Sequence, residues 1–184
     1  SNNHLFDCWA GDHLLMCRHF KKLFASDILT RIMELSNFDI LDVCNRLDLE
    51  NVRVCCCDEL RRYRGRNNKA FIVNWSRSSE PGTHWSALFF CDDGATALWF
   101  DSFGRREMPL PVYRYIASRD VAEINSSLLD VQNVHSLDCG WFSILFLYYC
   151  MHGTGPGGFY RMFKNNSTVD NDDVLQEVME RLID

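Results

Sequence analysis

The sequence lacks the cysteine spacing that forms most structural zinc sites. Nine cysteines occur among 184 residues, yet no two of them form a Cys-x-x-Cys pair. Their odd number also disfavours a framework built only of disulfides. Residues 55–57 are three consecutive cysteines, and in an extended segment these side chains alternate between opposite sides. We therefore predict reduced thiols, no metal site and an intracellular, reducing environment.

Long apolar runs and an excess of positive charge are also missing. No apolar stretch reaches the roughly 18 residues of a membrane-spanning helix, so we expect no membrane partner. The formal net charge is −6, which gives no general reason to expect a polyanionic partner. Hydrophobic residues make up 47% of the chain, enough for a substantial core. We predict one domain over residues 1–184.

The order of periodic segments predicts an α+β fold in which helices pack on a mixed central β-sheet. An Asp-Asp-Gly turn at 92–94 indicates a hairpin, residues 58–69 read as a polar loop, and the glycine-rich stretch 153–158 should end the preceding helix. Helices are expected at 26–35, 38–47, 110–118, from residue 139 onward and at 170–183, and strands at 51–57, 69–75, 84–91, 96–101 and 127–134. Residues 1–48 form a helical N-terminal extension, 50–150 a core and 159–184 a C-terminal helical segment.

Cys139 stands at the start of an almost wholly apolar run, "CGWFSILFLYYC", which predicts a buried helix. A thiol at a helix N-terminus faces unpaired backbone N–H groups and the positive end of the helix dipole. Both favour the thiolate, the form in which cysteine is a nucleophile. Gly140 leaves the space beside the sulfur open. A buried core cysteine is the alternative.

His84 and Asp101 are predicted to be cross-strand neighbours. His84 begins the strand "HWSALFFC" and Asp101 ends "TALWFD", and the turn between them folds these two ends together. A carboxylate beside an imidazole can orient it, and with a thiol these groups form a nucleophile, a base and an orienting acid. Gln132, shortly before Cys139, could donate its amide to an oxyanion. Asn133 is an alternative donor.

The series His84-Trp85, Asp101, Gln132 and Asp138-Cys139-Gly140 resembles the cysteine peptidases grouped around adenain and the SUMO-specific proteases, over roughly residues 50–150. The overall likeness is to adenain-like proteases of double-stranded DNA viruses and virus-like transposons. The acid and the residue before the nucleophile look more like the SUMO proteases.

The resemblance implies a thiol endopeptidase with catalytic residues His84, Asp101, Gln132 and Cys139 and with Trp85 and Gly140 in the substrate site. It also implies cleavage after small residues such as glycine, in viral precursor proteins during virion maturation, in the host nucleus or the virion. A ubiquitin- or SUMO-like deconjugase and an acyltransferase with the same catalytic arrangement are the alternatives. No Gly-x-Ser-x-Gly elbow supports a serine hydrolase.

Accessory factors follow from the same resemblance. No cofactor is required, but adenain-like enzymes use DNA and an activating peptide, which makes both of them candidate activators of this chain. Between Cys91 and Cys139 the chain has no cysteine to anchor such a peptide. We predict instead that residues 1–48 brace the domain in cis. A DNA contact is predicted at the basic cluster formed by Arg61, Arg62, Arg64, Arg66 and Lys69, for which a solvated loop is the alternative.

Overall fold

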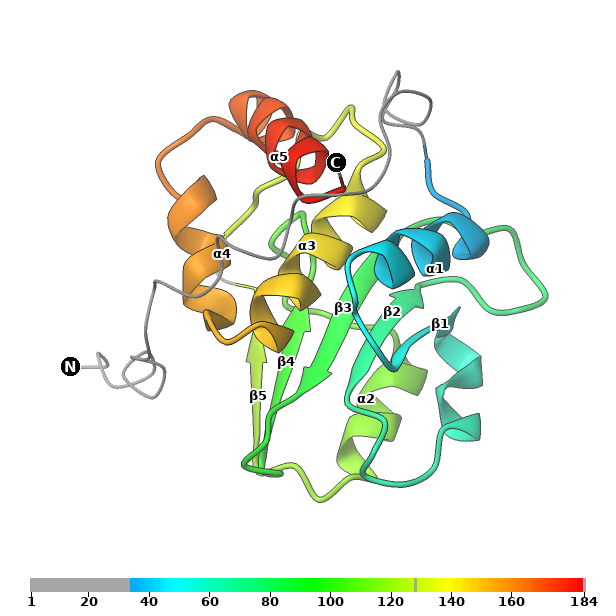
Figure 1. The fold of residues 1–184 in the computed structure, drawn as a ribbon. Helices are drawn as coiled ribbons and strands as arrows, with labels where there is room; N and C mark the ends of the chain where they lie inside the picture. The colour runs from blue at the N-terminus through cyan, green and yellow to red at the C-terminus, as the bar shows by residue number, and fades with distance from the viewer. Residues whose placement is uncertain (1–33, 128, 184) are drawn as a thin grey trace.

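The computed structural model describes residues 34–127 and 129–183. Its centre is a five-stranded sheet in the order β1-β2-β3-β4-β5 (Figure 1). The strands are β1 Val52–Cys56, β2 Ala70–Asn74, β3 Trp85–Phe90, β4 Thr96–Phe100 and β5 Glu123–Ser126. The outer pairs β1/β2 and β4/β5 are parallel, whereas β2/β3 and β3/β4 are antiparallel. The predicted mixed sheet, and the hairpin within it, are confirmed.

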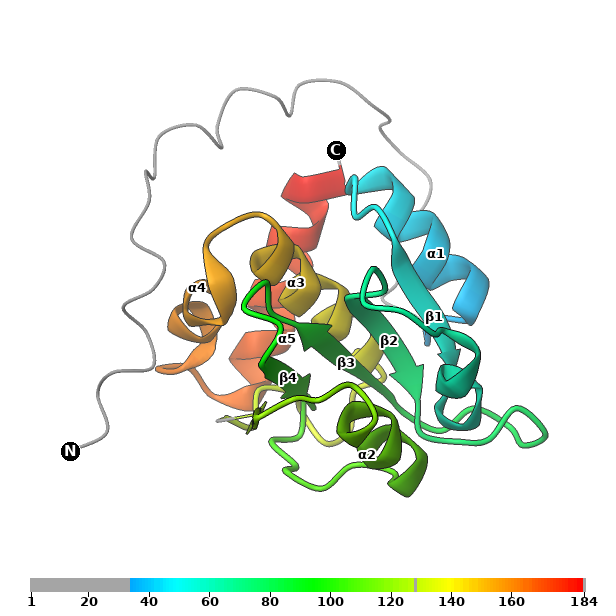
Figure 2. The same cartoon turned by 90° about the horizontal axis from the view of Figure 1, so that it is seen from below.

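Alternating side chains of the sheet fill two separate cores. On β2, Ile72 belongs to one hydrophobic cluster, while its neighbours Phe71 and Val73 belong to the other. On β4, Phe100 and Trp99 divide in the same way. This is the two-residue period of a strand that is buried on both faces. The sheet is therefore a middle layer covered by helices on each side (Figure 2).

In the described part of the chain, helices cover both faces of the sheet (Figures 1 and 2). The first face carries α1 Asn37–Arg46, α3 Cys139–Met151, α4 Gly155–Phe163 and α5 Thr168–Ile183, and the second carries the 3₁₀ helix η2 Cys57–Arg62 and α2 Leu110–Ala117. Helix α3 is central: only Tyr149 and Met151 among its residues are not fully buried. A helix that is apolar all round must be surrounded by protein, as predicted for it.

A capping box formed by Ser36 and Asp39 starts helix α1. The Ser36 hydroxyl accepts a hydrogen bond from the backbone N–H of Asp39, and the Asp39 carboxylate accepts one from the backbone N–H of Ser36. This capping box satisfies two N–H groups that a helix end leaves unpaired. The predicted helix over 26–35 lies almost entirely outside the described residues, as does most of the extension 1–48.

Two predictions about local structure were wrong, and a third was confirmed with an addition. Residues 57–62 form η2, where a polar loop was expected. The strand expected at 127–134 is displaced to β5 at 123–126; the described residues of 127–134 contribute one isolated bridge, between Asp130 and Phe103. The glycine-rich stretch ends α3 but also starts α4 at Gly155, because proline is tolerated in the first turn of a helix.

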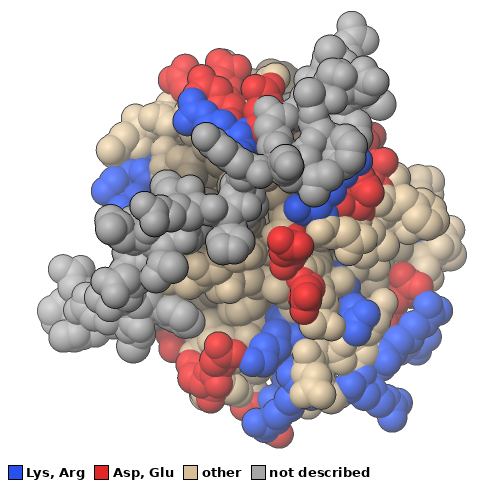
Figure 3. Space-filling model, viewed as in Figure 1, with Lys and Arg blue, Asp and Glu red and all other residues tan. Residues whose placement is uncertain are grey.

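Charge is unevenly distributed over the surface. Acidic side chains gather near α5 at the top of the view, and Lys and Arg side chains gather toward the lower right, in the region of η2 and α2 (Figure 3). Among the described helices, none is long and apolar enough to cross a membrane.

Candidate active site

His84 and Asp101 meet at one end of the β3/β4 hairpin. Ala87 pairs with Phe100, and continuing that register places Ser86 opposite Asp101, so His84 reaches the carboxylate diagonally. The distance from His84 Nε2 to Asp101 Oδ2 is 2.6 Å. The sequence thus predicted the right partners, although they are diagonal neighbours and do not face each other directly.

Asp101 is fully buried and held by several donors. The Ser86 hydroxyl donates to Oδ2 at 2.9 Å, and the backbone N–H of Phe103 donates to Oδ1 at 3.0 Å. Burial alone would raise the pKa of Asp101, but the hydrogen bond and the charge of His84, with these donors, lower it below its usual value. The carboxylate is therefore kept ionised beside the imidazole.

Aromatic rings fix the plane of the His84 imidazole. Phe103 stacks on it with ring centroids 5.2 Å apart, and Trp75 meets it edge-on at 5.5 Å. Burial would lower the pKa of His84, but hydrogen bonds with Asp101 and with the Cys139 thiol outweigh that effect and raise it to about 9. Because Nε2 faces Asp101, Nδ1 is the nitrogen left for the thiol.

Cys139 is the first residue of α3, as predicted, and it is nearly buried, with 8% of its surface exposed. Helix α3 lies against β3, where the Ser143 hydroxyl contacts the backbone oxygen of Trp85 at 3.4 Å. This packing brings the N-terminus of α3 to the strand that follows His84. The structure thus unites a thiol, an imidazole and a carboxylate that are widely separated in the sequence.

Gln132 is buried and held on both sides of its amide. Its Oε1 accepts from the Ser102 hydroxyl at 2.6 Å, and its Nε2 donates to the backbone oxygen of Ser136 at 2.9 Å. A backbone carbonyl can only accept, so the amide orientation is determined, and one Nε2 hydrogen stays available. The alternative donor, Asn133, instead uses its side-chain oxygen to accept from the backbone N–H of His135.

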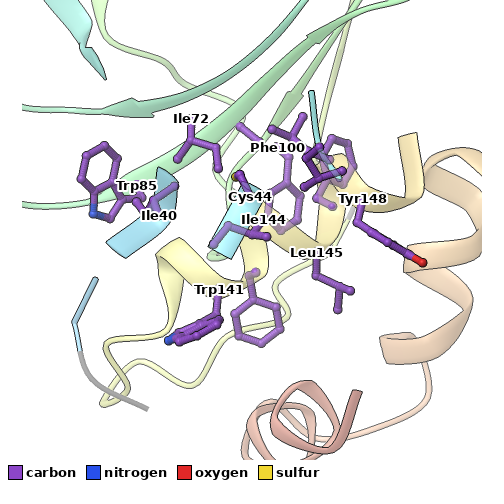
Figure 4. Packing of buried hydrophobic residues seen from close by; sticks show 14 of the residues in the cluster. Ile40, Cys44, Ile72, Trp85, Phe100, Trp141, Ile144, Leu145 and Tyr148 are labelled. Carbon is purple, nitrogen blue, oxygen red and sulfur yellow. The ribbon is translucent and has the colours of Figure 1, made fainter. Parts of the chain in front are cut away.

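Trp85 and Gly140 both face the segment that precedes α1. The Trp85 indole N–H donates to the backbone oxygen of Leu35 at 3.0 Å, and the ring lies beside Ile40 of α1 (Figure 4). A Cβ atom on Gly140 would come within 3.3 Å of the Leu35 side chain. Trp85 also lines a hollow of about 490 Å³ whose border includes Asn74 and Gly82.

Asp138, immediately before the nucleophile position, has an unusual titration. Burial, and after it the charge of the nearby Asp172 carboxylate, together raise its pKa to about 6. Two carboxyl groups therefore lie near the loop that connects Gln132 to Cys139.

Several site residues were missed by the sequence analysis. Ser86 holds Asp101, Ser102 holds Gln132, and Ser127 bonds to both backbone groups of Asp101. Ser86 had a usable signal, because residues two apart on a strand share a face and it follows His84 at that spacing. Ser102 and Ser127 gave none, since their partners are distant in sequence.

Comparisons with known proteins agree with this architecture. No protein-family model matches the chain, and no curated protein does. Among solved structures, the ASFV pS273R protease superposes with a TM-score of 0.51 at 14% identity, over 82% of this chain and 68% of that one. The chain therefore shares the fold of that protease.

Two further solved structures superpose less closely. The C-terminal Ulp1 protease domain in complex with Smt3, the yeast ortholog of SUMO, gives a TM-score of 0.49 at 11% identity over 84% of this chain and 79% of that one. ChlaDub1 from Chlamydia trachomatis gives 0.47 at 13% identity over 79% and 77%.

Proposed function

We propose that this chain is a cysteine peptidase in which Cys139 is the nucleophile, His84 the acid and base, and Asp101 the residue that orients His84. One observation carries the proposal: Nε2 of the His84 imidazole lies 2.6 Å from Asp101 Oδ2, and hydrogen bonding to Asp101 and to the Cys139 thiol raises the pKa of the imidazole. This arrangement activates a thiol and supplies a proton for a leaving amine. The cysteine-protease fold supports the same assignment.

The chemistry follows from the protonation of His84. With a pKa raised to about 9, the imidazole is protonated at neutral pH. Cys139 attacks the peptide carbonyl carbon as the thiolate, with its proton held on His84, to give a tetrahedral oxyanion. His84 then gives its Nδ1 proton to the amine as the C–N bond breaks, leaving a thioester. Water, deprotonated by His84, attacks the thioester and releases the carboxylic acid and the free thiolate.

Gln132 and the backbone N–H of Cys139 are proposed as the donors to the oxyanion. The available Nε2 hydrogen of Gln132 belongs to an amide that Ser102 and Ser136 hold rigidly. Such preorganised donors stabilise the charge that develops in the transition state. In the substrate site we propose Trp85, which borders the 490 Å³ hollow, and Gly140 beside the nucleophile.

The finer proposal is an endopeptidase that cleaves after glycine or another small residue in viral precursor proteins, in the nucleus or the assembling virion. A narrow tunnel roofed by Trp85 would favour such residues. We expect activity from the purified, reduced chain without added DNA or peptide.

A paired substrate experiment tests this function. The purified chain is given a peptide library and, separately, a panel of glycine-ended ubiquitin-like probes. We expect cleavage of peptides with a small residue before the scissile bond, abolished in Cys139→Ala and retained in Cys91→Ala, a control at another cysteine. Modification of the probes without peptide cleavage would instead indicate a deconjugase. Unchanged cleavage by Cys139→Ala would contradict the mechanism.

A further inference from the structure

A second hollow, on the sheet face opposite α3, is lined by arginines from three separate stretches of the chain. It has a volume of about 700 Å³, and its lining includes Arg61 of η2, Arg64 after it, Arg77 of the β2–β3 connection, Arg114 of α2 and Arg119 after α2. One acidic residue, Asp58, also lines it. The lining therefore carries five positive charges and one negative charge on a protein whose formal net charge is −6.

The structure separates these arginines from the rest of the basic cluster predicted from the sequence. Arg62 pairs with Glu59 at 2.6 Å, Arg66 with Asp120 at 3.8 Å, and Lys69 with Asp92. These three cations are neutralised by carboxylates of the chain itself. The remaining two, Arg61 and Arg64, line the hollow instead.

Four of the arginines in the hollow have no carboxylate partner. In the part of the chain that the structure describes, no ion pair involves the guanidinium of Arg61, Arg64, Arg77 or Arg114, and all four are exposed. The one acidic group, Asp58, accepts from the Ser78 backbone N–H and hydroxyl at 2.9 and 3.0 Å, and the charge of Arg77 acts on its carboxylate without forming an ion pair. Like charges gathered in one hollow repel each other unless an anion binds among them.

The fifth arginine is held in place by uncharged groups. Arg119 donates to the Tyr115 hydroxyl at 2.8 Å and to the backbone oxygen of Asn68 at 3.1 Å, and its guanidinium lies 4.4 Å from the centre of the Phe90 ring. These contacts fix the side chain without neutralising its charge. Arg119 is therefore a preorganised cation just after the C-terminal end of α2.

We propose that this hollow binds a compact ligand that carries several phosphate groups. Arginine guanidinium groups match phosphate oxygens with paired N–H donors, and five of them converge from different elements on one site. The volume lies in the range of small-molecule sites. An extended nucleic acid would also meet the acidic surface of the chain, whereas a small polyphosphate fits within the basic region at the lower right of Figure 3.

Calorimetric titration with inorganic tripolyphosphate tests the proposal. The full chain is used as the Cys139→Ala variant, so that binding is measured independently of any peptidase activity. We expect saturable binding that weakens steeply with salt, and orthophosphate should bind much more weakly. Replacing both Arg61 and Arg114 by alanine should weaken tripolyphosphate binding by at least about tenfold, since each charge-assisted contact is a strong one. Arg161→Ala on α4, across the sheet, is the matched control and should bind normally.

Thermal unfolding and a nucleic-acid arm complete the test. Without ligand, the double variant should unfold at the same or a higher temperature than the parent, because repulsion between arginines is relieved. Tripolyphosphate should raise the melting temperature of the parent but not of the double variant. The proposal is overturned if tripolyphosphate does not bind, or if the double variant binds it unchanged. It is also overturned if a single-stranded oligonucleotide binds at least ten times more tightly than tripolyphosphate and loses that binding in the double variant, which would identify an extended backbone as the ligand.

Discussion

Ser86 donates its hydroxyl hydrogen to the same Asp101 carboxylate oxygen that His84 contacts. An ionised carboxylate can only accept, so the serine is the donor, and the Ser86 oxygen accepts in turn from the Trp75 indole N–H at 2.8 Å. Trp75 also packs against the His84 ring. Through these two hydrogen bonds Ser86 connects the Asp101 carboxylate to Trp75, the residue that packs against the His84 ring.

Replacing Ser86 by alanine should therefore impair catalysis more than substrate binding. The change leaves the partly buried Trp75 N–H without its Ser86 acceptor and removes one donor to Asp101. We expect a loss of about 1–3 kcal/mol in the free energy of unfolding and a fall in kcat of roughly ten- to a hundredfold as the imidazole is misplaced. KM should stay nearly constant. Steady-state kinetics measures kcat and KM, and chemical denaturation measures the free energy of unfolding. Ser118→Ala, on the far side of the sheet, is the control. An unchanged kcat would show that Ser86 has no positioning role.

The pH dependence should report the titration of His84. Because its folded pKa is raised to about 9 from 6.5, the protonated form is favoured by folding. Its contribution to stability is complete below pH 6.5 and is lost as pH rises through about 9. The imidazolium that protonates the leaving amine is lost over the same range, so kcat/KM should fall near pH 9.

Asp101→Asn should move the alkaline fall in kcat/KM, the alkaline limb of the pH profile, to lower pH. The asparagine removes the charge that raises the pKa of His84 but leaves the burial that lowers it. A shift of at least about one pH unit, with a loss of roughly 10²–10⁴ in kcat, is expected from the loss of correct general acid–base function. Profiles of kcat/KM against pH for both proteins provide the measurement. If the limb keeps its position, His84 and Asp101 are not coupled as described.

Gln132→Ala should lower kcat by roughly 10²–10³ with little effect on KM, the expected loss for one oxyanion donor. The neighbouring Asn133→Ala is the matched control, because its side chain serves a local turn. If kcat fell strongly in the Asn133 variant and stayed normal in the Gln132 variant, Asn133 and not Gln132 would be the oxyanion donor.

Asp138→Asn should stabilise the protein above pH 6. The folded pKa of Asp138 is raised to about 6, chiefly by burial, so folding favours the protonated carboxyl. The resulting stability is present below about pH 4 and is lost as pH rises through about 6. Asparagine does not ionise, and we expect a gain of about 1 kcal/mol at pH 7.5 after solvent screening, or a few degrees in melting temperature. No gain should appear at pH 3.5. The exposed Asp173→Asn is the control, and a gain that is equal at both pH values would show that ionisation of the buried carboxyl is not its cause.

Leu35 and Gly140 should be energetically coupled. A Cβ atom on Gly140 meets the Leu35 side chain at 3.3 Å, so Gly140→Ala should be tolerated better when Leu35 is also alanine. A double-mutant cycle in unfolding free energy should give a coupling of about 1 kcal/mol or more. Strict additivity would mean that the segment before α1 does not brace the nucleophile. Deleting residues 1–48 removes both Leu35 and α1 and should lower activity or solubility.

The parts of the fold that local patterns specify were predicted correctly. The aromatic-rich, largely apolar runs "HWSALFFC" and "TALWFD", with the turn between them, indicate a hairpin whatever the rest of the chain does. The apolar run after Cys139 likewise predicts a buried helix. Since His84, Asp101 and Cys139 stand at the ends of these elements, most of the candidate triad could be inferred from the sequence.

The parts that depend on distant partners could not be predicted. Residues 123–126 form β5 because β4 offers them a parallel edge, and nothing in "EINS" distinguishes them from the more apolar residues that follow. The hollow lined by arginines could not be predicted from the sequence for the same reason. Arg77 and Arg114 are far from Arg61 in sequence, and only the packing of α2 beside η2 brings them together.

The alkylation rate of each cysteine, measured by timed iodoacetamide labelling near pH 7 and peptide mapping, tests the central claim most directly. Among all nine cysteines, Cys139 should react fastest, because the charged imidazole of His84 favours its thiolate. Burial raises the pKa values of Cys44, Cys91 and Cys150, and those thiols should react slowly. His84→Gln should slow Cys139 by at least about tenfold and leave the others unchanged. Faster labelling of another cysteine while Cys139 stays inert, in a protein that still cleaves peptides, would contradict the account.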